Sequence, residues 1–245
     1  MNILLVCAHP DDETIGMGGT LKKLAKKHQI SVLFLSDGII ARRQTGYVSS
    51  PKYEISKDEM NKMKKEIEVR KKHARNALKT FGIKNMRFLD LPNQELDQIP
   101  ILKIIKEIEK EIQVTKCSTI FTHHYNDLNV DHRIAYEATI TAARPLPWSK
   151  VSSIISFEIP ASTDWRRPYH FNPNLYVDIS KELPAKLKAL KQYNYEIRKM
   201  PHPRSEEITI AVAQRWGSLA GVKAAEAFEI VMTRIQNIDD SFLAK

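Results

Sequence analysis

Cysteine, long apolar runs and acidic residues are all scarce in this chain of 245 residues. Only two cysteines occur, Cys7 and Cys117, and each stands in a short apolar run where a small buried thiol is expected, so we predict no disulfide. No apolar run approaches the roughly 20 residues that cross a bilayer, and the run 3–8 stops at His9, which excludes a signal peptide. We expect a cytoplasmic protein with no stable membrane insertion.

The shortage of acidic residues, 29 against 38 basic ones, leaves a net charge of +9. Such a charge is typical either of a protein with an anionic partner, such as nucleic acid, or of lysine-rich solvated helix faces. Much of the excess falls in residues 57–79 and 181–199, where apolar residues keep helical spacing and lysines occupy the outer positions. Basic residues do not alternate with exposed aromatics, so we favour solvated helices and expect no nucleic-acid partner.

Short apolar runs alternate with helical patterns along the first half of the chain. The runs typical of buried strands are 3–8, 30–35, 86–89 and 117–122. Helical spacing occurs in 21–27, in 60–81 before Gly82, and after Pro100, where Ile101, Ile105, Ile108 and Ile112 are expected to face inward; residues 42–57 read as a long loop. The alternation predicts an α/β fold with a doubly wound, mostly parallel, Rossmann-like sheet and helices on both faces.

The last third of the chain is less regular. Residues 154–159 and 175–179 have the pattern of extra strands, 181–199 has the pattern of a helix, and 227–232 fits either a strand or a helix. No repeat, low-complexity tract or linker interrupts the sequence. We therefore expect one domain over residues 1–245, with its oligomeric state left open and a homo-oligomer possible.

Potential metal ligands follow two of the predicted strands. His9, Asp11 and Asp12 come after the first strand. After the fourth strand come His123, His124, Asp127, Asp131 and His132. The carboxyl ends of parallel strands meet at one edge of a sheet, so the two loops can converge there. Catalytic zinc takes three imidazole or carboxylate ligands and keeps one position open. For Asp12, a helix N-cap is the structural alternative.

The hexapeptide AHPDDE at residues 8–13, GMGG at 16–19 and the pair Asp131-His132 occur in the same order as in a known family. They resemble the motifs of the LmbE-like, or PIG-L, family of zinc-dependent N-acetylglucosaminyl deacetylases. The SDG turn at 36–38, Arg70 and Gly82 extend the resemblance. The first motif is the most specific of these.

The resemblance implies a role for each motif residue. It assigns His9, Asp12 and His132 to Zn²⁺, although such ligands also accept other divalent transition metals. It implies that Asp11 is the general base and that Asp131, also in the catalytic site, orients the neighbouring loop.

Two positions depart from the family pattern. Asn129 stands where the family often has a histidine thought to help hold the oxyanion, so the oxyanion donor stays open. Arg70 is followed after three residues by His73 instead of glutamate. We retain Asn129 and Arg70 as substrate-binding candidates.

Three further candidates lie outside the motifs. His202 stands between two prolines that make the backbone rigid, so it is either a second catalytic proton donor or part of a surface turn. Arg204 is a candidate for binding a substrate phosphate or hydroxyl. Arg42, in the long loop after residue 38, is a candidate because that loop can cover the pocket.

The leading hypothesis is a hydrolase that removes an acetyl group from an N-acetyl amino sugar, either nucleotide-linked, glycan-linked or part of a cell-surface polysaccharide precursor. The alternative is an amidase or deacetylase acting on a thiol-pathway glycoside or conjugate, an activity the same family contains. A nucleotide-binding module without catalysis is disfavoured, because GMGG at 16–19 lacks the dinucleotide-binding spacing of glycines.

Overall fold

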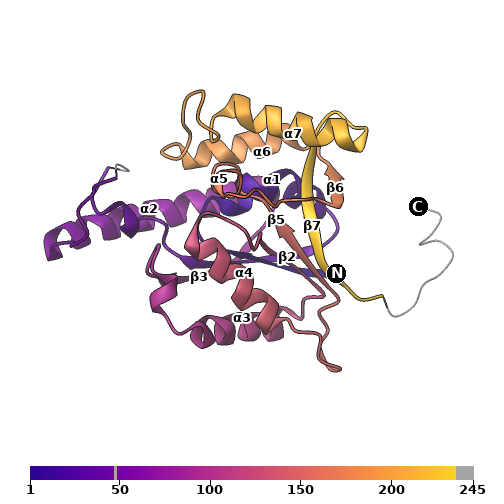
Figure 1. Ribbon diagram of the computed structural model, residues 1–245, viewed down its shortest axis with the longest axis horizontal. Helices are drawn as coiled ribbons and strands as arrows, with labels where there is room; N and C mark the ends of the chain where they lie inside the picture. The colour runs from indigo at the N-terminus through magenta and orange to yellow at the C-terminus, as the bar shows by residue number, and fades with distance from the viewer. Residues whose placement is uncertain (47–48, 236–245) are drawn as a thin grey trace.

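The computed structural model describes residues 1–46 and 49–235. Its centre is a seven-stranded sheet in the order β3-β2-β1-β4-β5-β7-β6, with helices on both faces (Figure 1). The strands are β1 (Asn2–Cys7), β2 (Gln29–Ser36), β3 (Asn85–Leu91), β4 (Thr119–His123), β5 (Ser153–Phe157), β6 (Leu175–Asp178) and β7 (Ala225–Thr233). The predicted doubly wound α/β class is confirmed.

The first five strands are parallel, and a helix crosses over between each of these strands and the next. The crossover helices are α1 (Asp12–Leu24), α2 (Lys57–Phe81), α3 (Ile101–Thr115) and α4 (Val130–Ala142). Strand order reverses between β1 and β4, since β2 and β3 extend the sheet to one side and β5 to the other. This switch point is where ligands bind in open α/β sheets.

The C-terminal third adds an antiparallel edge to the parallel sheet. Strand β7 pairs antiparallel with both β5 and β6, so the ambiguous segment 227–232 is a strand. The remaining elements are α5 (Ser162–Trp165), α6 (Leu183–Leu190), α7 (Glu206–Ala220) and the short 3-10 turns η1 (Ile40–Arg42), η2 (Leu96–Gln98) and η3 (Lys191–Tyr193). The helix predicted at 181–199 was too long, because it ends with η3 and an irregular segment follows.

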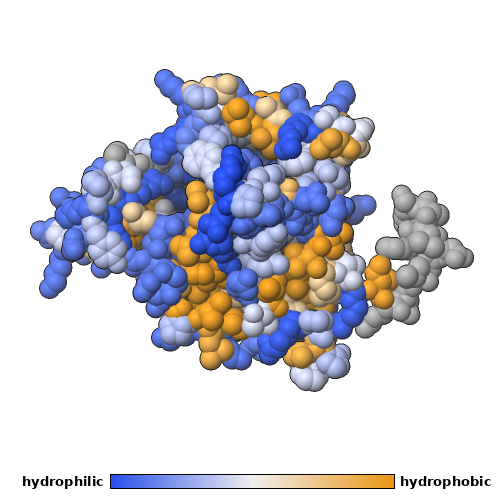
Figure 2. Space-filling view, in the orientation of Figure 1, coloured by the Kyte–Doolittle hydropathy of each residue, from blue (hydrophilic) through white to orange (hydrophobic). Residues whose placement is uncertain are grey.

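Two apolar layers enclose the sheet. On one face α3 and α4 contribute Ile104, Ile105 and Ala135 to the core, and on the other face α1, α2 and α6 pack together (Figure 1). The expectation that Ile101 faces inward was wrong, since its side chain is 43% exposed in the first turn of α3. In the view of Figure 2, apolar residues gather on the lower half of the surface and hydrophilic residues cover most of the rest.

Helix α1 begins at Asp12 and therefore includes the glycines that we expected to precede a helix at Leu21. A Cβ added at Gly16 would lie 2.4 Å from the ring of Phe157, so a side chain there would collide with β5. Glycine thus lets the first turns of α1 pack directly on the sheet. Close packing of α1 on the sheet therefore accounts for glycine at this position without a bound nucleotide.

Helix α2 ends at Phe81 as its sequence predicts, but it begins at Lys57, before the predicted start at Met60. Ser56 and Glu59 form a capping box at its start, and Gly82 ends it with a left-handed φ of 92°. The helix projects beyond the sheet, and the irregular segment that precedes it lies at its outer end (Figure 1). No helix in the described part of the chain is long and apolar enough to cross a membrane.

Candidate active site

The three predicted ligands meet at the switch point of the sheet. His9 and Asp12 follow β1, and His132 lies in the first turn of α4 after the adjacent strand β4. Nδ1 of His9 lies 3.2 Å from Nε2 of His132 and 3.4 Å from Oδ2 of Asp12. Oδ1 of Asp12 lies 3.5 Å from Nε2 of His132. All three side chains are buried and form the candidate metal centre.

The residues present fit a tetrahedral metal ion. Two ligands about 2.1 Å from a tetrahedral zinc are about 3.4 Å apart, which is close to the 3.2 Å between the two ring nitrogens and to the 3.5 Å between Nε2 of His132 and Oδ1 of Asp12. Oδ1 of Asp12 is buried and accepts no hydrogen bond from any described residue. Asp12 is not a side-chain N-cap, because its Oδ2 accepts from the backbone N–H of His9 at 2.7 Å instead.

Each histidine of the triad is backed by a carboxylate. Oδ2 of Asp131 lies 3.0 Å from Nε2 of His9, and the Asp131 carboxylate also accepts from the backbone N–H groups of Gln94 and Leu96 in the loop after β3. A carboxylate behind a histidine leaves the other ring nitrogen free for a metal. Asp131 therefore contacts both the neighbouring loop and a ligand, and the second contact was not predicted.

Asp127 backs the other histidine. Its Oδ1 lies 3.2 Å from Nδ1 of His132, and its Oδ2 accepts from the hydroxyls of Ser162 at 2.9 Å and Thr163 at 2.7 Å. Burial raises the pKa of Asp127, but the charge of His132 and these hydrogen bonds outweigh burial and lower the pKa to about 2. Asp127 is therefore a carboxylate at neutral pH, suited to hold His132 in one orientation.

The charges of the triad favour a cation. Burial lowers the pKa of His9, but Asp12 and Asp131 outweigh it and raise that pKa to about 10. Burial raises the pKa of Asp12, yet His132 and His123 hold it well below its usual range. The pocket between His9 and Asp12 thus stabilises positive charge, which a divalent metal supplies.

The other histidines of the fourth-strand cluster do not join the triad. Nε2 of His123 accepts from the backbone N–H of Ala8 at 2.9 Å, and its ring stacks on His132 with 4.0 Å between centroids. Burial and the charge of His132 lower the pKa of His123 to about 4. His124 turns away, with Nε2 3.2 Å from a carboxylate oxygen of Glu229.

Asp11, the predicted base, precedes α1 in a strained conformation. Its φ is 121°, in the region that residues with a side chain rarely adopt. Oδ2 lies 3.1 Å from a guanidinium nitrogen of Arg70 and 3.1 Å from Nη1 of Arg204. Burial raises the pKa of the Asp11 carboxyl above its usual value, against the opposing effect of the two arginines.

Glu13 supports the backbone of Asp11. One of its oxygens accepts from the Asp11 N–H at 3.0 Å and the other from the hydroxyl of Tyr193 at 2.8 Å. Burial raises the pKa of Glu13 to about 7. This buried acid connects the metal-binding loop to η3, which lies 180 residues later in the chain.

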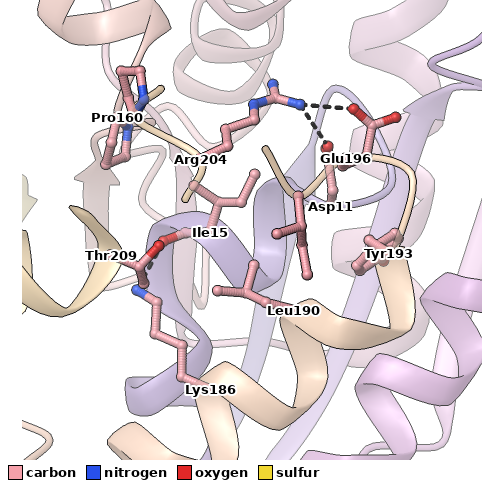
Figure 3. Close-up of a pocket in the computed structure, with 11 residues that line it drawn as sticks. Asp11, Ile15, Pro160, Lys186, Leu190, Tyr193, Glu196, Arg204 and Thr209 are labelled. Carbon is pink, nitrogen blue, oxygen red and sulfur yellow. Dashed lines mark hydrogen bonds and ion pairs between the residues drawn. The ribbon is translucent and has the colours of Figure 1, made fainter. Parts of the chain in front are cut away.

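Glu196, which the sequence analysis missed, joins three arginines of the site. Its carboxylate accepts from Arg42 and Arg70. It also accepts from Nη1 of Arg204 at 3.0 Å, and Figure 3 shows Arg204 between Glu196 and Asp11. Burial raises the pKa of Glu196, but these guanidinium groups lower it to about 2. No local pattern marks Glu196, because Arg42 and Arg70 are 154 and 126 residues away.

Arg70 lies deep in this network. It is 3% exposed and reaches Asp11 and Glu196 from α2. Gly38, with φ of 71°, lets the chain pass over the guanidinium group, since a Cβ there would lie 2.8 Å from Nε of Arg70. His73, the residue in place of the usual glutamate, faces the rings of Tyr193 and Tyr195 instead.

The remaining candidates line an outer cleft of about 650 Å³. Its lining includes Arg42, Asn129, Trp165, Arg198, His202 and Arg204. Asn129 caps α4, with its side-chain oxygen accepting from the Asp131 N–H at 2.9 Å. Nδ1 of His202 accepts from the Arg204 N–H at 3.0 Å, and burial lowers the pKa of His202. The structure thus brings all the predicted site residues to one region.

Comparison with known proteins identifies the class of this fold and site. The sequence profile of the PIG-L family, described as GlcNAc-PI de-N-acetylase, matches residues 4–143. The chain is 28% identical over 206 residues to the uncharacterized deacetylase YaiS of Escherichia coli, covering 78% of this chain and 89% of that one. It is 27% identical over 237 residues to the diacetylchitobiose deacetylase of Thermococcus kodakarensis, covering 94% and 82%.

Solved structures share the fold. The N,N'-diacetylchitobiose deacetylase of Pyrococcus horikoshii has a TM-score of 0.70 at 22% identity, covering 94% of this chain and 84% of its own. The 4-carboxy-2-hydroxymuconate hydratase of Pseudomonas putida has a TM-score of 0.72 at 19% identity, covering 97% and 99%. The fold alone therefore does not decide the reaction.

Because the family profile covers more than half of the chain, the chain belongs to the PIG-L, or LmbE-like, family. It is a deacetylase-family enzyme with a buried His-Asp-His candidate metal site.

Proposed function

We propose that this protein is a metal-dependent hydrolase that removes the acetyl group from an N-acetyl amino sugar. The observation that carries the proposal is the buried triad of His9, Asp12 and His132 next to a carboxylate, Asp11, that two arginines hold. Zn²⁺ bound by the triad would polarise the acetamide carbonyl and lower the pKa of a bound water towards about 7.

The chain's own residues supply the proton transfers. Asp11 accepts a proton from the attacking water, and the same carboxyl group then gives a proton to the departing amine. The amide C–N bond breaks, and acetate and the free amino sugar leave. The raised pKa of Asp11 suits both steps, because a carboxyl that titrates closer to neutrality can take up a proton and return it.

Arg70 and Arg204 keep Asp11 in place, and the outer cleft receives the sugar. Asn129 is a candidate oxyanion donor, because its side-chain oxygen is bonded to Asp131 and its amide N–H groups have no acceptor among the described residues. We assign Arg42 and Arg204 to the substrate. His202 lines the same cleft and remains the second candidate for proton transfer.

The names of the relatives support an amino-sugar substrate. One relative is the diacetylchitobiose deacetylase of Thermococcus kodakarensis. Another is the probable N-acetyl-alpha-D-glucosaminyl L-malate deacetylase 2 of Bacillus cereus, which is 24% identical over 200 residues. For this chain we therefore place an N-acetylglucosamine derivative first among the substrates to be tested.

The test is acetate release by the zinc-loaded protein from a panel of N-acetylhexosamine derivatives. We expect release to stop when a chelator removes the metal and to return when Zn²⁺ is added. Asp11→Asn keeps the shape of the side chain and should lower the rate by a factor of about 10² or more. Unchanged acetate release by this variant would exclude Asp11 as the base.

A further inference from the structure

Helix α1 has a break at Met17, whose φ of −146° and ψ of 28° are not helical. In an unbroken helix the N–H of Gly19 would donate to the C=O of Ile15, four residues earlier. A break between these two residues leaves backbone polar groups in the interior of the protein, where each needs a hydrogen-bond partner. Side chains from two distant elements supply such partners.

A buried ion pair lies at the break. Nζ of Lys186, from α6, donates to the Ile15 C=O at 2.8 Å (Figure 3). The same Nζ lies 2.7 Å from Oε1 of Glu226 on β7, and the two side chains are only 6% and 4% exposed. The Glu226 carboxylate accepts from the N–H of Gly19 at 3.0 Å and from the N–H of Thr20 at 2.7 Å. The ion pair thus binds one backbone group before the break and two after it, and side chains that insert into a helix in this way are a known cause of kinks.

Two glycines of the GMGG motif make room for this arrangement. A Cβ added at Gly18 would lie 3.2 Å from Cγ of Lys186, and one added at Gly19 would lie 2.7 Å from the side chain of Ile179, just after β6. Side chains at these positions would crowd the Lys186 stem and the segment between β6 and α6. The proposed function assigns no role to this motif, whereas close packing of the C-terminal third on α1 accounts for it.

The segment before the break carries the chemistry. The Asp11 C=O accepts from the Ile15 N–H at 2.9 Å, so residues 11–15 form one closed turn. This turn contains Asp11, the predicted base, and Asp12, a candidate metal ligand. The turn ends at the carbonyl that Lys186 binds, and Lys186 and Asp11 border the same small cavity of about 30 Å³. Because the helix is interrupted after this turn, the contacts across the break decide where the turn lies.

We infer that Lys186 and Glu226 are positioning residues for the metal centre: their ion pair holds the turn 11–15 so that Asp12 faces the two histidines of the triad. Neither member of the pair lies within residues 4–143, which the family profile matches, so the metal centre depends on the C-terminal third. The inference rests on the proposed function for the presence of a metal, but metal binding can be measured without any substrate.

The test measures Co²⁺ binding by the full chain, because the absorption spectrum of bound Co²⁺ reports the geometry of its ligands. Lys186→Met keeps an aliphatic stem beside Gly18 and removes the charge. We expect it to lower Co²⁺ affinity about tenfold or more and to change the spectrum, since residues that orient metal ligands have effects of this size. The double variant Lys186→Met, Glu226→Gln leaves no isolated buried charge and should show the same loss, so it serves where the single variant does not fold.

Ile108→Ala is the matched control for loss of stability. Ile108 is fully buried on α3, on the face of the sheet opposite α1 and α6, so the change destabilises the fold from the other side. Urea unfolding compares the stability of the variants. We expect Ile108→Ala to keep the affinity and the spectrum of the wild type. If the Lys186 variants also keep both and lose only stability, the ion pair does not position the metal ligands and the inference is overturned.

Failure of the proposed function gives a different result. A wild-type chain that binds no Co²⁺ rejects the metal-dependent hydrolase, and the inference falls with it. A wild-type chain that binds Co²⁺ but releases acetate from no sugar rejects the deacetylase alone, because the affinities and spectra of the Lys186 variants still decide whether the ion pair positions the metal ligands.

Discussion

Oδ1 of Asp127 lies 3.2 Å from Nδ1 of His132, so a carboxylate stands directly behind the imidazole whose other nitrogen faces His9 and Asp12. The hydroxyls of Ser162 and Thr163 donate hydrogen bonds to the other oxygen of Asp127, Oδ2. The orientation of one candidate metal ligand thus depends on the segment that follows β5, well outside the sequence motifs.

Removing this support should weaken metal binding. We expect Asp127→Ala to lower zinc affinity about 10- to 100-fold, because His132 loses the contact that selects its tautomer and orientation. Ser162→Ala removes only one of the hydrogen bonds to Asp127 and should have a smaller effect. The measurement is competition with a chromophoric chelator. A folded Asp127→Ala protein with unchanged zinc affinity would refute the assignment.

The network around Glu196 predicts a large effect on stability. Glu196→Gln leaves three arginines with one fewer buried negative charge, and breaking a buried ion pair in this way typically costs about 3–5 kcal/mol. Urea unfolding measures the loss. Glu206→Gln is the control: Glu206 pairs with Lys191 at the surface, where the two side chains are 41% and 58% exposed, and its loss should cost about 1 kcal/mol or less.

Glu158 predicts a pH-dependent gain in stability. Burial, with the nearby charge of Asp164, raises its pKa to about 7, and its carboxylate accepts a hydrogen bond from the Trp216 indole at 2.6 Å. A folded-state pKa above the unfolded value means that stability falls as pH rises from about 4.5 to about 7. Glu158→Gln keeps an acceptor for Trp216 and removes the ionisation. It should stabilise the protein by up to about 3 kcal/mol at pH 8 and by little at pH 4.

Unfolding curves of Glu158→Gln at both pH values check this expectation. Glu207→Gln, an exposed change on α7, should alter stability little at either pH. A stabilisation by Glu158→Gln that is equal at pH 4 and pH 8 would contradict the role of ionisation.

The contact between α1 and β5 predicts that one added methyl group at Gly16 lowers the stability of the protein. In Gly16→Ala the new Cβ would lie 2.4 Å from the Phe157 ring, which is fully buried and next to His123. We expect a loss of about 1–3 kcal/mol from overpacking, measured by thermal unfolding. Phe157→Leu should be less harmful in the Gly16→Ala background than in the wild type. Simple addition of the two effects would argue against this contact.

Local patterns were sufficient for much of the fold. Alternating apolar runs and helical faces predicted the doubly wound sheet, because a buried parallel strand is apolar along its whole length and a covering helix is apolar on one side. They failed where local signals were weak or misleading. The glycines at 16–19 indicated a loop, but they lie in α1, where Gly16 packs against Phe157. The pattern of 227–232 fitted either a helix or a strand, and only pairing with β5 and β6 makes this segment a strand.

The sequence by itself determined the candidate metal ligands, since His9 and Asp12 lie three residues apart in one motif and His132 in another, and strand order in a parallel sheet brings the two loops together. Only the tertiary structure decided what surrounds them. The contact of Asp127 with His132 and the contacts of Glu196 with three arginines were not predicted, and those of Glu196 with Arg42 and Arg70 join segments far apart in the chain. Contacts of this kind have no characteristic separation in the sequence, because only the folded chain brings the charged groups close together.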